Sequence, residues 1–339
     1  MFEYVEGDFL QSDQNGSSPA QHVASDTQDE AIGNRLAIVI MVEPGFLEWQ
    51  SILLCSALAQ CCKTPYAVHP YCRADRIDAL HPFTKEFLNA QTEGVRPINP
   101  AFNGEYPNGN KIYACAEHRK EQYTLFLDTD ILPLRPFDLK FLMRPNLVAG
   151  VQGKVATWSN ATGRWKKLYA LAGCDGPDTY KVVGDETLAH PYLNAGFVFF
   201  SDPEMARKWL DVALMVDFDE TIEQKRPWLD QITLPVAVAA NNSALAFLPN
   251  QWNRNCDAEV AQRQKVKLLH YHTLINIVEK GHKDFADALL KDAVNVSLEE
   301  LVEMLKNDGV DIFKPGLQQR LHAAQSGLDG FLNRLMKKK

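Results

Sequence analysis

Two aspartates separated by one residue carry the strongest chemical signal in this sequence. The apolar segment at residues 123–127 is followed by Asp128, Thr129 and Asp130. Alternate residues of an extended chain share a face, so Asp128 and Asp130 are expected to point to one place. Carboxylates held so close repel each other unless a cation or a proton lies between them. A hard cation such as Mg²⁺ or Mn²⁺, which can bridge diphosphate oxygens, suits this pair.

The position of the pair also matters, because acidic residues at the end of a strand often form only a solvated loop or a helix cap. In open α/β sheets, ligands bind outside the carboxyl ends of the strands. Asp128 and Asp130 are expected at such an end. The combination of residue type and position favours a cation site.

Asn194 and Gly196 interrupt another apolar segment, YLNAGFVFF, at residues 192–200. A glycine inside a strand allows another group to approach the backbone closely, and asparagine offers both a donor and an acceptor. This suits the recognition of sugar hydroxyls. A bulge or a turn at the start of the strand is the competing structural interpretation.

Other polar residues have both a functional and a structural interpretation. Lys111 precedes the strand that ends at Asp128 by one expected helix, and it suits the neutralisation of diphosphate charge as well as an ordinary surface position. Asp230 and Gln231 lie near the start of another expected helix, where an acid also interacts favourably with the helix dipole.

A mostly parallel α/β sheet is expected to position these groups. Residues 36–42 form a continuous apolar and β-branched segment, which is typical of a strand buried on both faces. Helical spacing of apolar residues follows at 46–62 and again at 73–88, with a short strand candidate between them. Further strands are expected at 123–127, 147–151, 193–200, 245–248 and 266–271. This alternation of strands and helices predicts the α/β class.

The chain divides into three expected parts. Residues 1–33 lack an apolar period and predict a flexible tail, residues 34–290 a globular domain, and residues 291–339 a helical extension. A leucine stripe with basic residues runs through 316–339. It fits a helix docked on its own domain or on a second copy in a homodimer, and it also fits a helix in peripheral contact with a membrane.

Composition limits the class of protein. The 339 residues are 46% hydrophobic and carry a formal net charge of -8, which argues against a nucleic-acid partner because that role requires a basic surface. No apolar segment approaches the roughly 20 residues that span a bilayer, and the first residues lack the pattern of a signal peptide. The seven cysteines show no CxxC spacing and are interpreted as reduced thiols. We therefore expect a cytoplasmic protein.

Seven segments, in this order, resemble the nucleotide-sugar glycosyltransferases of the GT-A fold, and among them family 8, the glycogenin-like and galactosyltransferase-like enzymes. The segments are LAIVIMV, GNKIYAC, LFLDTDILPL, YLNAGFVFF, WLDQITL, LPNQWN and LLHYH. The resemblance implies a GT-A fold, with a mostly parallel Rossmann-like sheet flanked by helices. It also implies a hexosyltransferase that moves a sugar from a UDP-sugar to a glycan or another hydroxyl acceptor, with retention of configuration.

The same resemblance implies roles for particular residues. Asp128, Asp130 and His270 bind Mn²⁺ or Mg²⁺, with His272 as the alternative histidine because it shares the face of His270 if this segment is extended. Without the aspartates, the two histidines would be interpreted as hydrogen-bonded, partly buried imidazoles. The remaining positions implied in donor binding or at the reacting centre are Lys111, Asn194, Gly196, Asp230 and Gln231.

One feature departs from the family pattern. The family has a glycine and a lysine shortly after the metal histidine, whereas Lys280, Gly281 and Lys283 follow His270 here at a longer interval. The second cation for the diphosphate therefore has no assigned residue.

Two other functions remain open. Phosphatases of the haloacid-dehalogenase type also place two such aspartates after an apolar strand and use the first as a nucleophile. Their motif lies near the start of the domain and continues with threonine, whereas Ile131 follows Asp130 here. A protein that binds nucleotide or carbohydrate without turnover is the second alternative, since a fold alone does not establish activity.

Overall fold

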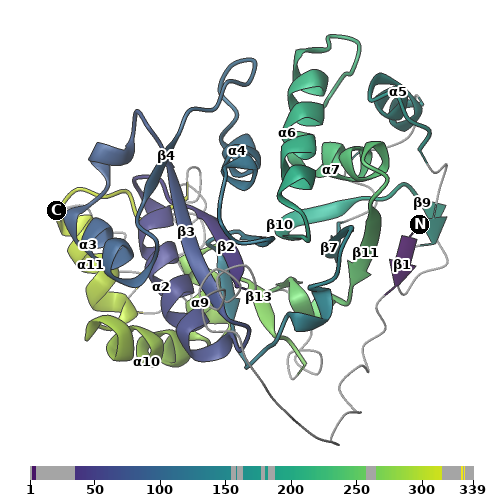
Figure 1. Cartoon of the computed structure of the whole chain (residues 1–339). Coiled ribbons are helices and arrows are strands. Elements are labelled where there is room, and N and C mark those ends of the chain that lie inside the picture. Colours follow the sequence, from purple (N-terminus) through teal and green to yellow (C-terminus); the bar gives the residue numbers. More distant parts are fainter. Residues whose placement is uncertain are drawn as a thin grey trace, which may run out of the picture.

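A mostly parallel sheet of eight strands forms the centre of the structure (Figure 1). The computed structural model describes residues 2–4, 35–153, 158, 163–176, 180–181, 188–256, 265–314, 330 and 332. The strand order is β1-β11-β7-β10-β5-β2-β3-β4, and β10 runs antiparallel to both of its neighbours whereas the other pairs are parallel. The strands are β1 (Phe2–Tyr4), β2 (Leu36–Met41), β3 (Tyr66–Arg73), β4 (Arg96–Ile98), β5 (Tyr123–Leu127), β7 (Leu147–Gln152), β10 (Leu193–Phe200) and β11 (Ala244–Leu248).

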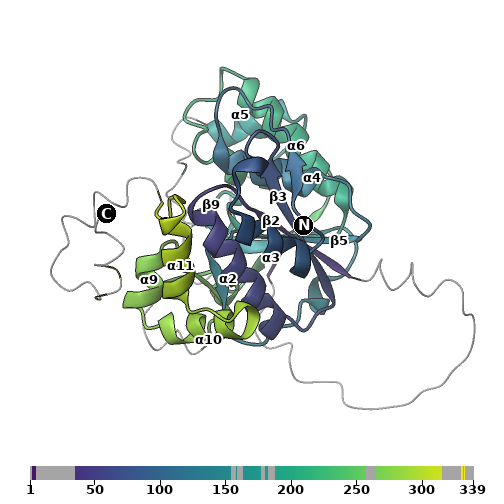
Figure 2. The same cartoon turned by 90° about the vertical axis from the view of Figure 1, so that its left-hand side faces the viewer.

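Helices cover both faces of this sheet (Figures 1 and 2). One face carries α4, α6 and α7, and the other carries α2 with α10 and α11 beside it. The helices are α2 (Phe46–Cys61), α3 (Pro82–Gln91), α4 (Asn110–Ala116), α5 (Arg164–Leu171), α6 (Pro203–Phe218), α7 (Leu229–Ala240), α9 (Leu274–Glu279), α10 (Lys283–Val294) and α11 (Leu298–Asn307). The predicted class, an α/β fold with a mostly parallel sheet flanked by helices as in the GT-A fold, is confirmed.

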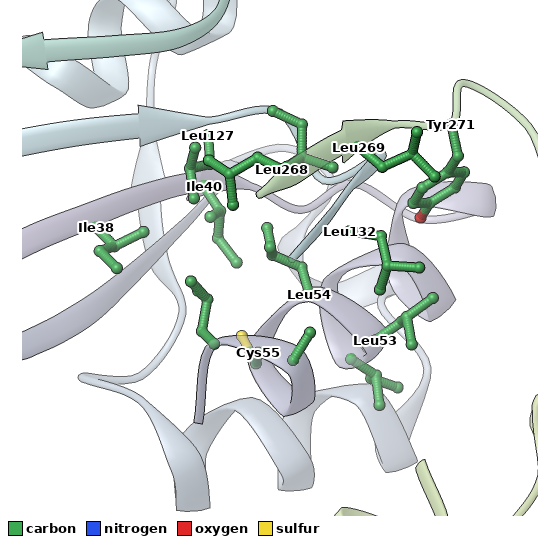
Figure 3. Close-up of a cluster of buried hydrophobic side chains, with 14 of the residues drawn as sticks. Ile38, Ile40, Leu53, Leu54, Cys55, Leu127, Leu132, Leu268, Leu269 and Tyr271 are labelled. Atoms are coloured by element: carbon green, nitrogen blue, oxygen red, sulfur yellow. The ribbon is translucent and has the colours of Figure 1, made fainter. Parts of the chain in front are cut away.

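The apolar sequence of β2 explains why both faces are covered. Ile38 and Ile40 point into the cluster on the α2 side (Figure 3), whereas Val39 and Met41 belong to the cluster on the α4 side. Neighbouring residues of a strand point to opposite faces, so an uninterrupted apolar segment can be buried only between two layers of helices.

A second, three-stranded sheet lies next to the end of β5. It consists of β12 (Arg254–Asn255), β13 (Leu268–His270) and β6 (Ile131–Pro133), in that order. The strand expected at 266–271 therefore pairs with the segment just after Asp130 and does not extend the main sheet. A two-residue pair, β8 (Tyr180–Lys181) and β9 (Leu188–Ala189), forms a third sheet.

The ends of the chain differ in part from the expected tail and extension. Phe2–Tyr4, within the predicted tail, pair with β11 in the main sheet. The predicted boundary at residue 290 falls inside α10, which packs with α2 and α11 in one cluster. Residues 316–339 lie outside the described residues except for Gly330 and Leu332, and Leu332 is buried in that same cluster. Among the described helices, none has the length and apolar character needed to cross a bilayer.

The buried sheet predicts a large difference between two phenylalanines. Phe199 of β10 is fully buried, whereas Phe218 at the end of α6 is 58% exposed. Phe199→Ala should lower the free energy of unfolding by about 3 to 5 kcal/mol, because it removes buried contacts and leaves a cavity. Phe218→Ala should change it by less than about 0.5 kcal/mol. Urea denaturation measures both, and similar values for the two variants would contradict this assignment of the core.

Candidate active site

The turn that carries the two aspartates is fixed by backbone hydrogen bonds to two other strands. The Asp128 N–H donates to the carbonyl of Gly196 on β10 at 2.9 Å, and the Tyr271 N–H donates to the carbonyl of Asp130 at 3.0 Å. The Ile131 N–H donates to the Asp128 carbonyl at 3.1 Å, which closes the turn. The turn is thus held between β10 and the end of β13.

Thr129 points away from this edge into the protein, as the alternation of side chains predicts. Its hydroxyl donates to Oε1 of the buried Gln50 on α2 at 3.1 Å, and its carbonyl accepts from the Tyr271 hydroxyl at 3.2 Å. Thr129 therefore fixes the turn to the protein interior, and the two carboxylates lie on the opposite side of the turn.

Asp130 and His270 form the most tightly defined contact of the site. Nε2 of His270 lies 3.0 Å from Oδ1 of Asp130, and both side chains are about nine-tenths buried. Nδ1 of His270 lies 3.0 Å from Oδ1 of the buried Asn253. With the amide oxygen facing the ring, Nδ1–H is the donor and Nε2 is directed at Asp130, an arrangement that fixes the orientation of metal-binding histidines.

His272 and Lys314 approach Asp130 from the other side. Nδ1 of His272 lies 3.9 Å and Nζ of Lys314 lies 3.7 Å from Oδ2 of Asp130. His272 has a left-handed backbone with φ of 62°, yet its ring lies 4.0 Å from that of His270. The extended backbone assumed in the sequence prediction is therefore absent at His272, although both rings still face the same carboxylate.

Asp128 belongs to a different set of contacts, centred on Lys111. The ammonium group of Lys111 lies 2.8 Å from Oδ1 of Asp128 and 3.6 Å from Oδ2 of Asp230, and it donates to the Ala195 carbonyl at 3.2 Å. Two carboxylates offset the charge of this buried lysine. The geometry thus favours a role for Lys111 in linking Asp128 to Asp230 over a role in neutralising diphosphate.

Gly196 lies between the contacts of Asp130 with His270 and the contacts of Asp128 with Lys111. A Cβ at this position would lie 3.0 Å from Oδ2 of Asp128, 3.1 Å from Oδ1 of Asn194 and 3.1 Å from Cε1 of His270. The Asn194 side chain accepts the Gly196 N–H at 2.9 Å, so it stabilises the local backbone. Oδ2 of Asp128 therefore faces the same space as the His270 ring.

Gln231 is less closely connected to the site. It lies in the first turn of α7, and its N–H donates to the Trp228 carbonyl at 3.0 Å. In the part of the chain that the structure describes, no hydrogen bond or ion pair joins its side chain to the other predicted residues. The structure thus brings together Lys111, Asp128, Asp130, Asn194, Gly196, Asp230 and His270.

The contacts around Asp130 shift its ionisation and that of His270 in opposite directions. Burial alone would raise the pKa of Asp130, but the charge and hydrogen bond of His270, with Lys314 and His272, lower it below its ordinary value. Burial disfavours the charged form of His270, yet the charge and hydrogen bond of Asp130 outweigh this and raise its pKa. Burial and then the charge of His270 lower the pKa of His272 to about 4. His272 is therefore neutral and free to act as a ligand at neutral pH.

Lys111 and the acids that it contacts, called the Lys111 set, show other pKa shifts. Burial lowers the pKa of Lys111, but Asp128 and Asp230 outweigh it and raise that pKa to about 12. Burial raises the pKa of Asp230, with Lys111 and the Tyr106 hydroxyl acting against it. A charged lysine beside two acids is thus the expected state.

Donor atoms of Asp130, His270 and His272 lie within 4.8 Å of one another, which suits one divalent cation. With Nδ1–H of His270 on Asn253, a neutral ring offers its Nε2 lone pair to a cation beside Asp130. Mg²⁺ prefers oxygen ligands alone, whereas imidazole with carboxylate suits transition metals such as Mn²⁺. The residues fit a cation, and Mn²⁺ fits better than Mg²⁺.

Lys314 and the role of Asn253 were not found from the sequence. Lys314 lies 44 positions after His270, beyond the three helices α9, α10 and α11, and no spacing rule connects them. Asn253 was noted only as part of the segment LPNQWN. A lysine followed by proline and glycine just before the basic extension was the one local signal for Lys314, and it was too short to interpret.

The space around Gly196 predicts the effect of a single methyl group. Gly196→Ala should weaken Mn²⁺ binding at least roughly tenfold, because the new Cβ displaces Asp128 or His270. Gly150→Ala is the matched control, since its Cβ would meet the Phe197 carbonyl at 3.0 Å and a Leu193 methyl group at 3.2 Å but no side chain of the cation site. Titration calorimetry with Mn²⁺ measures both variants. Equal affinities would show that Gly196 does not shape the cation site.

The opposed pKa shifts predict how pH changes stabilisation by Mn²⁺. The raised pKa of His270 stabilises the metal-free protein at low pH, and this contribution disappears as pH rises through the pKa of the folded state. The lowered pKa of Asp130 contributes above about pH 4 and is lost only as pH falls further. A cation must displace the proton of His270, so Mn²⁺ should raise the melting temperature more at about pH 8 than at about pH 5.5.

Differential scanning fluorimetry at both pH values, with His270→Gln as the control, measures this effect. The variant should show little stabilisation at either pH. An equal response of the wild type at both pH values would contradict a role for His270 as a metal ligand.

Comparisons with known proteins found similarity to glycosyltransferases. Among solved structures, the apo form of the bifunctional glycosyltransferase WbbM is 14% identical, with 84% of this chain and 53% of that chain covered and a TM-score of 0.49. Mouse xyloside xylosyltransferase 1 is 12% identical, with 70% and 96% covered and a TM-score of 0.38. The chain thus spans about half the length of WbbM. No curated protein matches the sequence.

The sequence also matches a protein family. Residues 38–242 match the Rhodobacterales glycosyltransferase domain, from β2 to the end of α7, and so include the three acids Asp128, Asp130 and Asp230. The predicted glycosyltransferase is confirmed, whereas family 8 stays a resemblance. Because the match covers more than half of the 339 residues, this chain belongs to the Rhodobacterales glycosyltransferase domain family.

Proposed function

We propose that this glycosyltransferase takes its sugar from a nucleotide-diphosphate donor, with a UDP-sugar as the expected donor, and requires a divalent cation. Glycosyl transfer follows from the family, and the donor, the cation and the stereochemistry are the proposed part. The observation that carries the proposal is the Asp130–His270 pair, with Nε2 at 3.0 Å from the carboxylate and Nδ1 fixed by Asn253. This pair lies beside the carboxyl end of β5, where α/β sheets bind ligands.

Asp130 and His270 would hold the cation, and Oδ2 of Asp128 and Nδ1 of His272 face the same space for a further ligand. When bound, the cation would act as a Lewis acid that takes up negative charge on the leaving diphosphate. Mn²⁺ is the expected ion because at least one imidazole belongs to the set. Asp128 would keep one oxygen on Lys111 at 2.8 Å, which fixes its other oxygen in place.

Lys314 supplies the cationic side chain that sequence analysis left unassigned. Its side chain is 49% exposed, and its ammonium group lies 3.7 Å from Asp130. A diphosphate beside the cation offers this ammonium group a more highly charged partner than one carboxylate. Lys111, in contrast, already pairs with Asp128 and Asp230 and is buried. We therefore propose that Lys314 binds the diphosphate of the donor.

Retention of configuration is the proposed stereochemistry. An inverting enzyme needs a carboxylate base that is free to take the proton of the acceptor hydroxyl. Asp230 and Glu43 are the two acids considered for this role. The Asp230 oxygens contact Tyr106 and Lys111, whereas Oε2 of Glu43 has only an ion pair with Arg76 at 3.5 Å and no hydrogen-bond partner among the described residues. Asp230 is thus engaged at both oxygens, which supports attack without Asp230 as a dedicated base. Asn194 and Gly196 would lie beside the donor sugar.

The acceptor is proposed only as a class, a hydroxyl group of a glycan or a similar molecule. Contact of residues 316–339 with a membrane or with a second copy in a homodimer also remains a proposal. Of this segment, the structure describes Gly330 and Leu332, and Leu332 is buried in the core cluster.

A thermal-shift panel tests the donor and the cation. A nucleotide present at about 100 times its Kd should stabilise the native state by about 2.7 kcal/mol. We expect UDP and UDP-sugars to raise the melting temperature when Mn²⁺ is present, and Asp130→Asn to abolish this shift. Asp138→Asn is the matched control, because Asp138 accepts from Thr64 and the Lys140 N–H in a separate contact.

A rise in melting temperature with a nucleotide other than UDP would change the proposed donor but not the proposed reaction. The absence of any nucleotide shift would contradict the proposal and direct attention to phosphatase assays. Shifts without sugar transfer or donor hydrolysis would identify a binding protein.

A further inference from the structure

We infer that Tyr106 is a positioning residue for sugar transfer, because its hydroxyl holds the carboxylate of Asp230 in place beside Lys111. The inference rests on the proposed function and on the role at the donor or the reacting centre that the family resemblance implies for Asp230. Tyr106 lies in the loop before α4 and far from Asp230 in sequence, and no motif connects the two residues.

The Tyr106 hydroxyl makes a two-sided contact with Asp230. It lies 2.9 Å from Oδ1 of Asp230 and accepts the backbone N–H of Asp230 at 3.1 Å. The Pro227 carbonyl at 3.0 Å is a second acceptor for the single hydroxyl proton. A charged carboxylate is the stronger acceptor of the two, so the proton is expected on Asp230.

The other oxygen of Asp230 faces the lysine. Oδ2 of Asp230 lies 3.6 Å from Nζ of Lys111, and Lys111 lies 2.8 Å from Asp128. The carboxylate is thus fixed at both oxygens, by a hydroxyl on one side and an ammonium group on the other. Without the hydroxyl, the carboxylate keeps the longer contact to Lys111 and the interaction with the Gln231 N–H, and its rotation about the Cβ–Cγ bond is less restricted.

Tyr106 itself is held rigidly by Arg226. The guanidinium group lies 4.9 Å from the centre of the Tyr106 ring and donates to the Glu105 carbonyl at 2.9 Å. Nη2 of Arg226 also donates to both oxygens of Asp217, each at 2.9 Å, and the Asp217 side chain is 1% exposed. Because the ring is fixed in this way, its hydroxyl also has a defined position, which an orienting group requires.

The ionisation of both partners fits this role. Burial and then the charge of Asp230 raise the pKa of Tyr106, so its hydroxyl stays a donor. Burial raises the pKa of Asp230, and the charge of Asp128 raises it further. Lys111, the Tyr106 hydroxyl and the Gln231 N–H each lower it. Loss of the hydroxyl should therefore raise the pKa of Asp230 further.

Tyr106→Phe is the test variant, and Tyr113→Phe is its matched control. Both rings meet Phe102 edge to face, at 5.4 Å and 5.3 Å, and both hydroxyls accept a backbone N–H, with Ala101 as the donor to Tyr113 at 3.0 Å. Each variant keeps the ring and loses the hydroxyl. Only Tyr106 contacts a carboxylate of the proposed site.

We expect Tyr106→Phe to lower kcat roughly ten- to hundredfold, with KM for the donor within about threefold of the wild type. The acidic limb of its kcat profile should move to higher pH, because Asp230 then binds a proton more readily. Tyr113→Phe should keep kcat within about twofold and leave the pH profile unchanged. Equal kinetics of the two variants would overturn the inference.

A double-mutant cycle with Asp230→Asn separates positioning from packing. If Tyr106 acts through Asp230, Tyr106→Phe should have almost no further effect on kcat in the Asp230→Asn protein. An undiminished effect in that background would also overturn the inference.

The same cycle measured by urea unfolding of the metal-free protein keeps this inference separate from the proposed function. Failure of the wild type to turn over any donor would contradict the proposed function. A non-zero coupling between residues 106 and 230 would then still support the contact, and additive effects on stability would contradict it.

Discussion

The antiparallel pairing of β6 with β13 is the interaction on which the candidate site depends. Its register places His270 opposite Ile131, one residue after Asp130, and the Tyr271 N–H continues the ladder to the Asp130 carbonyl. A shift of one residue would turn the His270 ring to the other face, because side chains alternate along a strand. Leu132, Leu268 and Leu269 of the two strands are buried in the same cluster (Figure 3), so apolar packing stabilises this pairing.

Within this frame, each acid of the site has a cationic partner. Asp128 and Asp230 share Lys111, and Asp130 has His270 with Lys314. A buried carboxylate without a partner costs several kcal/mol, so these pairs allow three acids to lie at one edge of a sheet before any ligand arrives. The pairing also fixes side-chain positions, because each contact orients both of its partners. A divalent cation at Asp130 would compete with the proton of His270 and with the ammonium group of Lys314, whereas the Lys111 set would stay in place.

The sequence predicted the main strands because they have local signals, whereas the roles expected of most candidate site residues came from the family resemblance. Continuous apolar segments predicted β2, β5 and β10, and two acids at a strand end predicted the turn after β5. The small sheet had no such signal, since a three-residue strand shows no period and its partner lies more than 130 residues away. The pairing of Asp128 with Lys111 and the left-handed backbone of His272 were equally invisible, because both result from packing of distant segments.

The origin of the cations around Asp130 shows why the later part of the chain belongs to the site. The family match ends at residue 242 and contains the three acids, whereas His270 and Lys314 both come from beyond it. The segment that carries Lys314 is held against α2, where the indole N–H of Trp49 donates to the Ile312 carbonyl at 3.1 Å and Phe313 is buried. Trp49 also lies 6.0 Å from the ring of Tyr271, next to His270. One buried tryptophan therefore supports both segments that bring positive charge to Asp130, and the proposed cation site combines acids of the matched domain with residues from beyond it.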